Sequence, residues 1–515
     1  MAAHTRKMGR FMKRFTLFFP VILMLLVCFA CSCQYNNTIE SNELEIFGHT
    51  VQKDATEITF SGNEIPSISE LSANLKLLQR LERVNLGSFH MFEEEMRSLS
   101  DEFPSVTFEY IPYVSVAGGT IPNDVESLDL EGRSDYNPEL LKQELSALKN
   151  LKSVSFGDDL IPADRLARIK ADFPQVEFTA IATYTVAGEV YREDITELDL
   201  SGNPVTENLV DLLKYFPLLE EVNLHDTGMP REQLLELKTV YPNIMLKAEV
   251  ELAGEMFSTE SEELDFNSRI IGDYGQFFES LVLFDHLSKV EMCDCGLSNE
   301  QLGALRDAYP NTKFVWRLYL GMKSLRTDAV AFSTLVGISD HLTSKDLEVL
   351  KYCTDLQSLD LGHQDIEDLS VIGEYLTDLR ILIVADNEIT DLSPLANLPH
   401  LHYLEFFMNE VTDLTPLTQC RELVDLNICW NTRLSDITPL LDLPVLERLW
   451  MTSVAVSQED IDLLLETYPG TEISTWGSGS TDQGWRTHDR YFAMIDMFYS
   501  RNYISEEFSK YDGMG

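Results

Sequence analysis

Leucines recur at a nearly fixed interval in the second half of the chain. Leu359, Leu382, Leu404, Leu426 and Leu449 are separated by 23, 22, 22 and 23 residues. Around them runs the pattern L-x-x-L-x-L-x-x-N-x-I-x-D-L-x-P-L, in which apolar residues alternate over a short strand before a return segment. One such coil cannot bury its own leucines, so the period predicts stacked coils that share a continuous core.

Polar residues recur within the same period. Asparagine stands at one fixed place and aspartate at another, as Asn387, Asn409 and Asn431, and as Asp368, Asp391, Asp413 and Asp436. The pattern resembles the leucine-rich repeat, and its 22-residue form with S-P-L or T-P-L is similar to the internalin type from bacterial surfaces. The resemblance implies an α/β solenoid with parallel strands on the concave face and helices or irregular turns on the convex face. It also implies that the asparagines bond backbone groups at the turn, a structural role.

A longer period appears in the first half. An aromatic-proline pair recurs at steps of 70, 68 and 68 residues, as Phe103-Pro104, Phe173-Pro174, Tyr241-Pro242 and Tyr309-Pro310. Each unit holds two strand patterns and a third after the pair; Leu198, Val222 and Leu246 lie 24 residues apart. We expect three coils per unit, the third interrupted by a turn at a recurring glycine. The alternative is a separate small α/β repeat domain.

These patterns divide the chain into six segments. We expect a lipoprotein-type signal peptide at 1–33, a linker at 34–45, a degenerate leucine-rich-repeat array in units of about 68 residues at 46–321, a junction at 322–355, internalin-like repeats at 356–475, and a linker with a C-terminal cap segment at 476–515. The last segment is rich in aromatic residues and methionine at roughly helical spacing. A docking segment is the alternative to a cap.

The first residues resemble a bacterial lipoprotein signal. A basic stretch precedes the apolar run 15–29, which ends in A-C-S-C. The resemblance implies lipid attachment at Cys33 (or Cys31), because Cys33 follows the small residues better. We therefore expect an extracytoplasmic protein anchored to the cell membrane by this N-terminal lipid alone; plain secretion and an uncleaved signal anchor are the alternatives.

The charge narrows the choice of partner. The net charge is -46 and becomes -51 without the five basic residues of the signal. Such a field repels nucleic acid and anionic lipid head groups. A cationic protein, a divalent cation or a neutral glycan remains open as partner. The alternative is that the acidic residues, which are spread along the chain, only keep the surface solvated.

Chemistry beyond binding finds little support. No G-x-S-x-G, H-E-x-x-H, phosphate-binding loop or zinc-type cysteine-histidine spacing occurs, so we expect no enzyme, no cofactor and no metal site. Five cysteines follow the signal, and an odd number argues against a disulfide framework. We expect most of them to be buried small hydrophobes.

Residues that flank the core leucine of each strand should face the concave surface. In the second array they form an apolar and aromatic cluster, which on an exposed face marks an interaction site. The candidate binding residues are Ile381, Ile383, Tyr403, Glu405, Phe407, Trp430, Arg448 and Trp450. The alternative is that a flanking loop or the C-terminal segment covers them. The first array offers a second, acidic surface that includes Glu197, Asp199, Ser201, Glu221, Asn223 and His225.

The expected function is that of a lipid-anchored cell-surface protein that binds a protein or glycan through the concave face of a repeat solenoid. The alternative is a structural or assembly component of the cell envelope. The two differ in whether the face meets a free ligand or a fixed neighbour.

Overall fold

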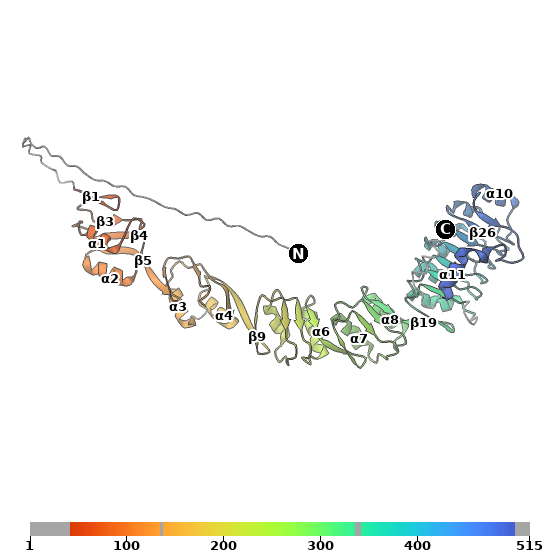
Figure 1. The fold of residues 1–515 in the computed structure, drawn as a ribbon, viewed down its shortest axis with the longest axis horizontal. Helices are drawn as coiled ribbons and strands as arrows, with labels where there is room; N and C mark the ends of the chain where they lie inside the picture. The colour runs from red at the N-terminus through yellow and green to blue at the C-terminus, as the bar shows by residue number, and fades with distance from the viewer. Residues whose placement is uncertain (1–41, 134–136, 335–340, 500–515) are drawn as a thin grey trace, which may run out of the picture. The chain divides into compact units, whose positions relative to one another are not determined.

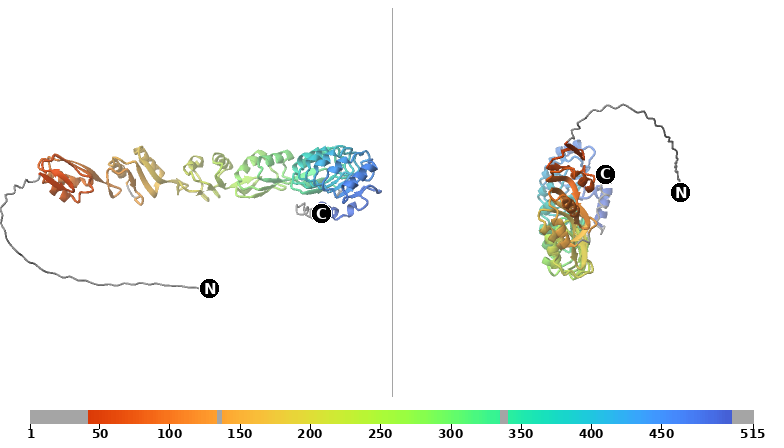
Figure 2. Two further views of the ribbon diagram at one scale, coloured as in Figure 1. Left: turned by 90° about the horizontal axis from the view of Figure 1, so that it is seen from above. Right: turned by 90° about the vertical axis from the view of Figure 1, so that its left-hand side faces the viewer.

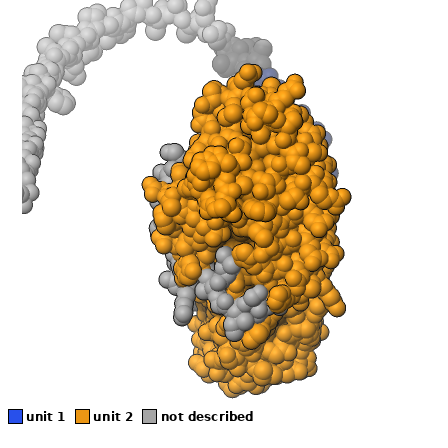
Figure 3. Space-filling view, turned by 90° about the vertical axis from the view of Figure 1, so that its right-hand side faces the viewer, with its two compact units in different colours: residues 1–157, 168–179 blue, residues 158–167, 180–515 orange. Residues whose placement is uncertain are grey.

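The computed structural model describes residues 42–133, 137–334 and 341–499. They form two compact units, residues 1–157 with 168–179 and residues 158–167 with 180–515 (Figure 3). The division passes through the first array and not through the expected junction at 322–355. That junction contributes β20, β21 and η3, and β21 pairs in parallel with β22.

The first unit alternates short strands with helices (Figure 1). Its elements are β1 (Glu43–Ile46), β2 (His49–Gln52), β3 (Glu57–Thr59), α1 (Ile68–Leu75), β4 (Arg83–Met91), α2 (Glu93–Glu102), β5 (Thr107–Val116), β6 (Gly119–Pro122), β7 (Ser127–Asp129) and α3 (Pro138–Ser146). The division between the units falls within β8 (Ser153–Pro162), α4 (Ala163–Asp172) and β9 (Glu177–Val186).

The second unit begins with two further units of the long period. Their elements are β10 (Glu189–Arg192), β11 (Glu197–Asp199), α5 (Leu209–Leu212), η1 (Leu213–Tyr215), β12 (Glu221–Asn223), α6 (Arg231–Val240), β13 (Met245–Lys247), β14 (Glu249–Leu252), β15 (Glu255–Ser258), β16 (Glu263–Asp265), α7 (Tyr274–Ser280), η2 (Leu281–Leu283), β17 (Lys289–Glu291), α8 (Asn299–Ala308), β18 (Lys313–Val315), β19 (Arg317–Leu320) and β20 (Lys323–Arg326). Labels with η mark 3-10 helices.

The second unit then forms a parallel sheet of seven strands, β21 to β27 in sequence order. Its elements are β21 (Ala331–Ser333), η3 (Ser344–Tyr352), β22 (Ser358–Asp360), α9 (Ser370–Tyr375), β23 (Ile381–Ile383), η4 (Ser393–Asn397), β24 (Tyr403–Glu405), η5 (Thr415–Gln419), β25 (Asp425–Asn427), η6 (Thr438–Asp442), β26 (Arg448–Trp450), α10 (Gln458–Thr467), β27 (Glu472–Ser474), η7 (Trp485–Thr487) and α11 (Asp489–Tyr499). The predicted leucine register is confirmed, since Leu359, Leu382, Leu404, Leu426 and Leu449 are direct neighbours along the sheet.

The long period is three parallel strands followed by an antiparallel hairpin. Leu198 pairs with Val222, and Val222 with Leu246, which confirms the predicted third strand. The hairpin of β14 and β15 turns at Ala253 and Gly254, which have φ of 51° and 83° as a two-residue hairpin turn requires. The hairpin follows directly on the third strand, so β11–β12–β13 and β16–β17–β18 are separate sheets. The turn at the recurring glycine therefore lies in a hairpin that follows the third strand, and the chain has an α/β repeat fold with mixed sheets.

The structural role of the asparagines is confirmed. Oδ1 of Asn409 accepts the Ile389 backbone N–H at 2.9 Å, and its Nδ2 donates to the Val384 carbonyl at 2.9 Å. Asn387 and Asn431 do the same one coil away on either side. Each amide thus pairs backbone groups that are buried beside the core.

The aspartates hold the return segments. Oδ1 of each accepts a backbone N–H two residues later, at 2.8 or 2.9 Å, at the start of α9, η4, η5 and η6: Asp368, Asp391, Asp413 and Asp436. Such local bonds satisfy donors that have no partner inside a short helix. The recurrent D-L-x-P-L is therefore a capping signal.

Candidate functional site

Strand faces in the two arrays differ in exposure. In β11 and β16 the central leucine is buried and both flanking residues are exposed. In β22 to β26 all three residues of every strand are buried. We call the flanking residues of these five strands the covered face: Ser358, Asp360, Ile381, Ile383, Tyr403, Glu405, Asp425, Asn427, Arg448 and Trp450. Their leucines already fill the core on the opposite side, so another part of the chain must bury them.

The C-terminal segment, residues 475–499, is the cover. Trp485 of η7 and Met494, Met497 and Phe498 of α11 are buried in one apolar cluster with side chains of the covered face. Helix α11 lies beside the sheet in both ribbon views (Figures 1 and 2). The structure therefore places this segment on the strand face and not over the open end of the core.

Seven of the eight candidate binding residues are buried, which agrees with the alternative in which the C-terminal segment covers them. Ile381, Ile383, Tyr403, Glu405, Phe407, Arg448 and Trp450 are at most 5% exposed. The physical reason is that two apolar surfaces of one chain bury each other when a tether of ten residues joins them. Only Trp430, which follows β25, remains 39% exposed.

An arginine anchors α11 to the sheet. The guanidinium of Arg490 donates to both carboxylate oxygens of Asp425, at 2.8 and 3.0 Å, and to Glu447 at 2.7 Å. Asp425 is fully buried and Arg490 is 4% exposed. Paired, two-point contacts of this kind are the strong form of charged hydrogen bond.

Two indole groups and a second arginine complete the contact. Nε1 of Trp485 donates to Oε1 of Glu405 at 2.7 Å, and Nε1 of Trp450 donates to the Asp482 carbonyl at 2.8 Å. The guanidinium of Arg448 lies 4.5 Å from the ring centre of Trp485 and 5.0 Å from that of Trp450. The face of an indole ring attracts a cation, so both tryptophans stabilise the charged guanidinium of Arg448.

The covered face holds carboxylates that are costly to bury. Burial raises the pKa of Glu405, although Arg486 and hydrogen bonds from Tyr403 and Trp485 lower it. Burial also raises the pKa of Asp360, against hydrogen bonds from the Ser333 hydroxyl and the Gly362 N–H. The face therefore favours a cationic neighbour, which α11 supplies.

The sequence contained a signal for this contact. Arg490, Met494, Met497 and Phe498 stand at i, i+4, i+7 and i+8, which places them on one side of a helix. Their targets are Asp425, which lies 65 residues before Arg490, and apolar residues on other strands of the covered face. The pattern alone identifies an amphipathic helix and not the surface that it meets.

The acidic surface of the first array is open. We call Glu197, Asp199, Glu221, Asn223, His225 and Lys247 the open face; Glu197 and Asp199 are exposed and the others are half-buried. Asp199 also accepts the Ser201 N–H at 3.0 Å and so shapes the end of its strand. This surface, unlike the covered face, is accessible to a macromolecule.

A histidine lies at the edge of the open face. Its Nδ1 is 2.6 Å from Glu249 and its Nε2 2.9 Å from Glu260. Burial lowers the pKa of His225, but hydrogen bonds and charges of Glu260 and Glu249 outweigh burial and raise it above its ordinary 6.5. The imidazolium thereby joins β12 to the hairpin that follows β13.

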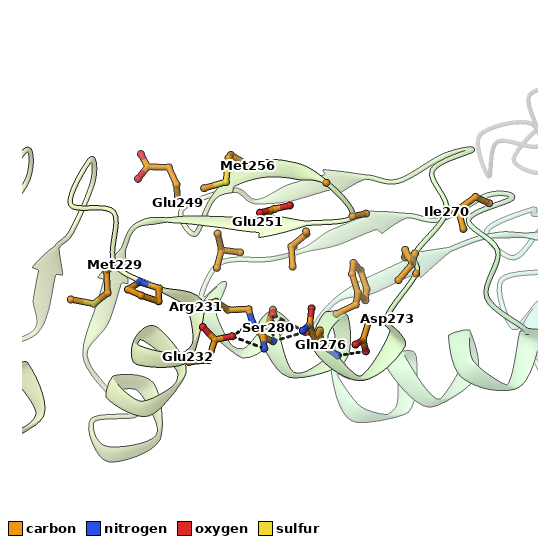
Figure 4. A pocket seen from close by; sticks show the side chains of 18 residues that line it. Met229, Arg231, Glu232, Glu249, Glu251, Met256, Ile270, Asp273, Gln276 and Ser280 are labelled. Atoms are coloured by element: carbon orange, nitrogen blue, oxygen red, sulfur yellow. Dashed lines mark hydrogen bonds and ion pairs between the residues drawn. The ribbon is translucent and has the colours of Figure 1, made fainter.

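A cavity of about 610 Å³ lies under the hairpin of β14 and β15 (Figure 4). Arg231 points into it from α6 and donates to the Gln276 carbonyl, to the Ser280 hydroxyl and to Glu232. Glu249 and Glu251 lie on the hairpin side (Figure 4). The guanidinium already has these acceptors, and carboxylates of Glu232, Glu249, Glu251 and Asp273 also line the cavity.

The five cysteines in the described residues are free and buried, as the sequence predicts: Cys293, Cys295, Cys353, Cys420 and Cys429. Burial raises the pKa of Cys429 to about 11 and that of Cys420 to about 12. These thiols are small core residues and not nucleophiles.

The expected acylation sites, Cys33 and Cys31, lie outside the described residues. Within residues 42–133, 137–334 and 341–499, every helix is too short or too polar to cross a bilayer. The lipid anchor accordingly stays a prediction.

Residues 377–419 match the family model described as Leucine Rich repeats (2 copies). This range contains β23 and β24 with their return segments. No curated protein matches the chain.

Three solved structures resemble the chain weakly. Internalin C2 from Listeria monocytogenes is 21% identical, with 43% of this chain and 86% of that chain covered and a TM-score of 0.25. An internalin (inlF) from the same organism is 14% identical, with 84% and 87% covered and a TM-score of 0.23. A leucine-rich-repeat protein from Leptospira interrogans is 13% identical, with 81% and 94% covered and a TM-score of 0.23. The assignment of leucine-rich repeats therefore rests on the family match and on the leucine register of the sheet.

Proposed function

We propose that this chain is an extracytoplasmic repeat protein, held at the cell membrane by a lipid on Cys33 (or Cys31), that binds a cationic protein. The binding surface is formed by the exposed acidic residues of β11 and β16, which we call the open strands. One observation carries the proposal. Glu197 and Asp199 on β11, and Glu263 and Asp265 on β16, are exposed and make no ion pair within the described residues. Adjacent unpaired carboxylates raise the local potential and attract a cationic partner.

The solenoid that the resemblance implies belongs to this proposal as well. Strands from successive repeats would present a broad surface, which suits a macromolecule better than a small ligand. The acidic composition supports a protein partner and disfavours nucleic acid. A neutral glycan is the alternative ligand.

The experiment compares charge reversal on and off the open strands. The full chain and its Glu197→Lys/Glu263→Lys variant are used to capture proteins from envelope extracts, and the affinity for any captured protein is then measured. We expect a loss of at least about tenfold, with a steep salt dependence. The matched control is Glu459→Lys/Glu466→Lys on α10, which changes the net charge equally at two exposed positions.

The outcomes separate the alternatives. An equal loss of affinity in the variant and in the control would attribute the effect to net charge alone and would overturn the proposed surface. Capture on a glycan array instead of a protein would redirect the ligand class. One stoichiometric envelope protein that remains bound at high salt would favour the structural role.

The lipid anchor has its own test. Cys33→Ser should move the protein from the membrane fraction to the soluble fraction, while Cys31→Ser should not. Continued membrane partitioning of the Cys31→Ser/Cys33→Ser double variant would remove the lipid from the proposal.

A further inference from the structure

We propose that the covered face is a second binding site, for an arginine-bearing amphipathic helix of another protein, and that α11 is a resident occupant that this helix displaces. The site shares no residue with the open acidic strands. It goes beyond the proposed function and does not depend on it.

The first argument is the way in which α11 occupies the face. Its four anchors, Arg490, Met494, Met497 and Phe498, are all buried, while Asp489, Phe492, Asp496 and Tyr499 on its other side are exposed. A helix that inserts residues at i, i+4 and i+7 into a groove is a common mode of peptide recognition. The covered face therefore already performs helix recognition within the chain.

Charge sets the chemistry of the ligand. Asp360, Glu405 and Asp425 are buried on this face, and Arg448 is its one buried cation within the described residues. A helix without a cation would leave Asp425 buried and without its two guanidinium bonds, which disfavours such a helix strongly. The ligand must therefore carry an arginine at the place of Arg490.

Incomplete pairing makes α11 replaceable. Oε2 of Glu405, Nε and Nη1 of Arg448 and Nε of Arg486 are buried without a hydrogen bond within the described residues. The nearest carboxylates to Arg448 at these atoms are 3.7 Å away. These contacts are ion pairs without a hydrogen bond, which is the weaker arrangement for a buried charge. A helix that forms hydrogen bonds to these atoms as well as to Asp425 would bind the covered face more tightly than α11 does.

The tether permits release. Gly477, Gly479 and Gly484 lie between β27 and η7, with φ of 153° at Gly477 and 94° at Gly484. Release of α11 leaves the leucine core of the sheet intact, because that core lies on the opposite side of the strands.

A second copy of the chain is a poorer occupant. Exchange of α11 between two copies replaces each contact by an identical one and pairs no further atom. Association still costs translational and rotational freedom. A partner helix with better pairing has a differential affinity that exchange lacks.

The test uses a labelled synthetic peptide of residues 485–499 and fluorescence anisotropy. Its targets are the full chain and two variants that loosen α11 without changing the covered face, Arg490→Glu and Met497→Asp. We expect the peptide to bind both variants at least about tenfold more tightly than the wild type, because the resident helix lowers the accessible fraction of sites. The peptide with Arg490→Glu should not bind.

A disulfide between the covered face and α11, which we call the lock, provides the control. The Ser358 hydroxyl lies 4.0 Å from Sδ of Met497, so Ser358→Cys/Met497→Cys should fix α11 when oxidised. The locked chain should not bind the peptide, and reduction should restore wild-type behaviour. The Glu197→Lys/Glu263→Lys chain should bind the peptide as the wild type does, which separates this site from the open strands.

Three results would overturn the proposal. The first is no peptide binding by either loosened variant while circular dichroism shows both to be folded. The second is binding that ignores the arginine of the peptide. The third is a wild-type dimer in light scattering that the oxidised lock abolishes, since that would assign the face to a second copy.

Discussion

At the scale of the residue, three polar side chains each form at least two hydrogen bonds and so connect separate parts of the chain. Asn409 bonds backbone groups of neighbouring coils, Arg490 holds both oxygens of Asp425, and His225 lies between two carboxylates. The first arrangement repeats with the period of the chain. The other two do not recur with that period, so no periodic pattern indicates them.

His225 gives the molecule a dependence on pH. Its folded pKa is raised, so the bound proton stabilises the folded state, fully so below the unfolded pKa of about 6.5. That stability is lost as the pH rises through the folded pKa. We expect the advantage of the wild type over His225→Gln in urea unfolding of the second unit to be largest at pH 6 and to shrink by pH 9.

The neighbouring carboxylates provide the controls for this pH effect. Glu249→Gln removes a hydrogen bond to the ring and should reduce the pH-dependent difference. Glu251→Gln, an exposed carboxylate two residues further along β14, should leave it unchanged. A profile that both substitutions alter equally would attribute the effect to general charge.

At the scale of the element, the sequence predicts the features that recur with its period. It does not predict contacts between residues that are far apart in the chain. Strand positions, the leucine register and the capping aspartates follow from local spacing, because each depends on residues within one coil. The separate sheets of the first array depend on the hairpin after each third strand, where the glycine predicts the turn and not the loss of pairing. The cover by α11 joins residues far apart in the chain, and spacing carries no information about such a contact.

The return segments α9 and η4 are closely packed against each other at Gly373. A Cβ added at Gly373 of α9 would lie 2.3 Å from the backbone oxygen of Pro394 in η4. Gly373→Ala should therefore force the two segments apart and destabilise the second unit by about 1–3 kcal/mol in urea unfolding. Gly470→Ala is the control, since a Cβ there meets nothing within 4 Å, and a shift under about 0.5 kcal/mol is expected. Similar effects of the two substitutions would show that α9 can move away at little cost.

At the scale of the whole molecule, the apolar core is divided within the first array and not at the change of sequence period. In the second unit one apolar core runs from Val186 to Leu464, through both the hairpin-linked sheets and the sheet of seven strands. A separate core, from Ile46 to Leu99, lies in the first unit. The change of period near residues 322–355 therefore changes the local geometry of the coils without ending the core of the second unit.

Separate cores predict separate unfolding. Leu86 and Leu404 are both fully buried, the first in the core of the first unit and the second in that of the second. Each substitution to alanine should cost about 2–5 kcal/mol through lost burial and the cavity that remains. Because a cavity affects only the cooperative unit that contains it, Leu86→Ala should lower hydrogen-exchange protection in residues 42–133 and leave residues 341–474 unchanged, and Leu404→Ala should do the reverse. Loss of protection throughout the chain from either substitution would mean that the two units unfold together.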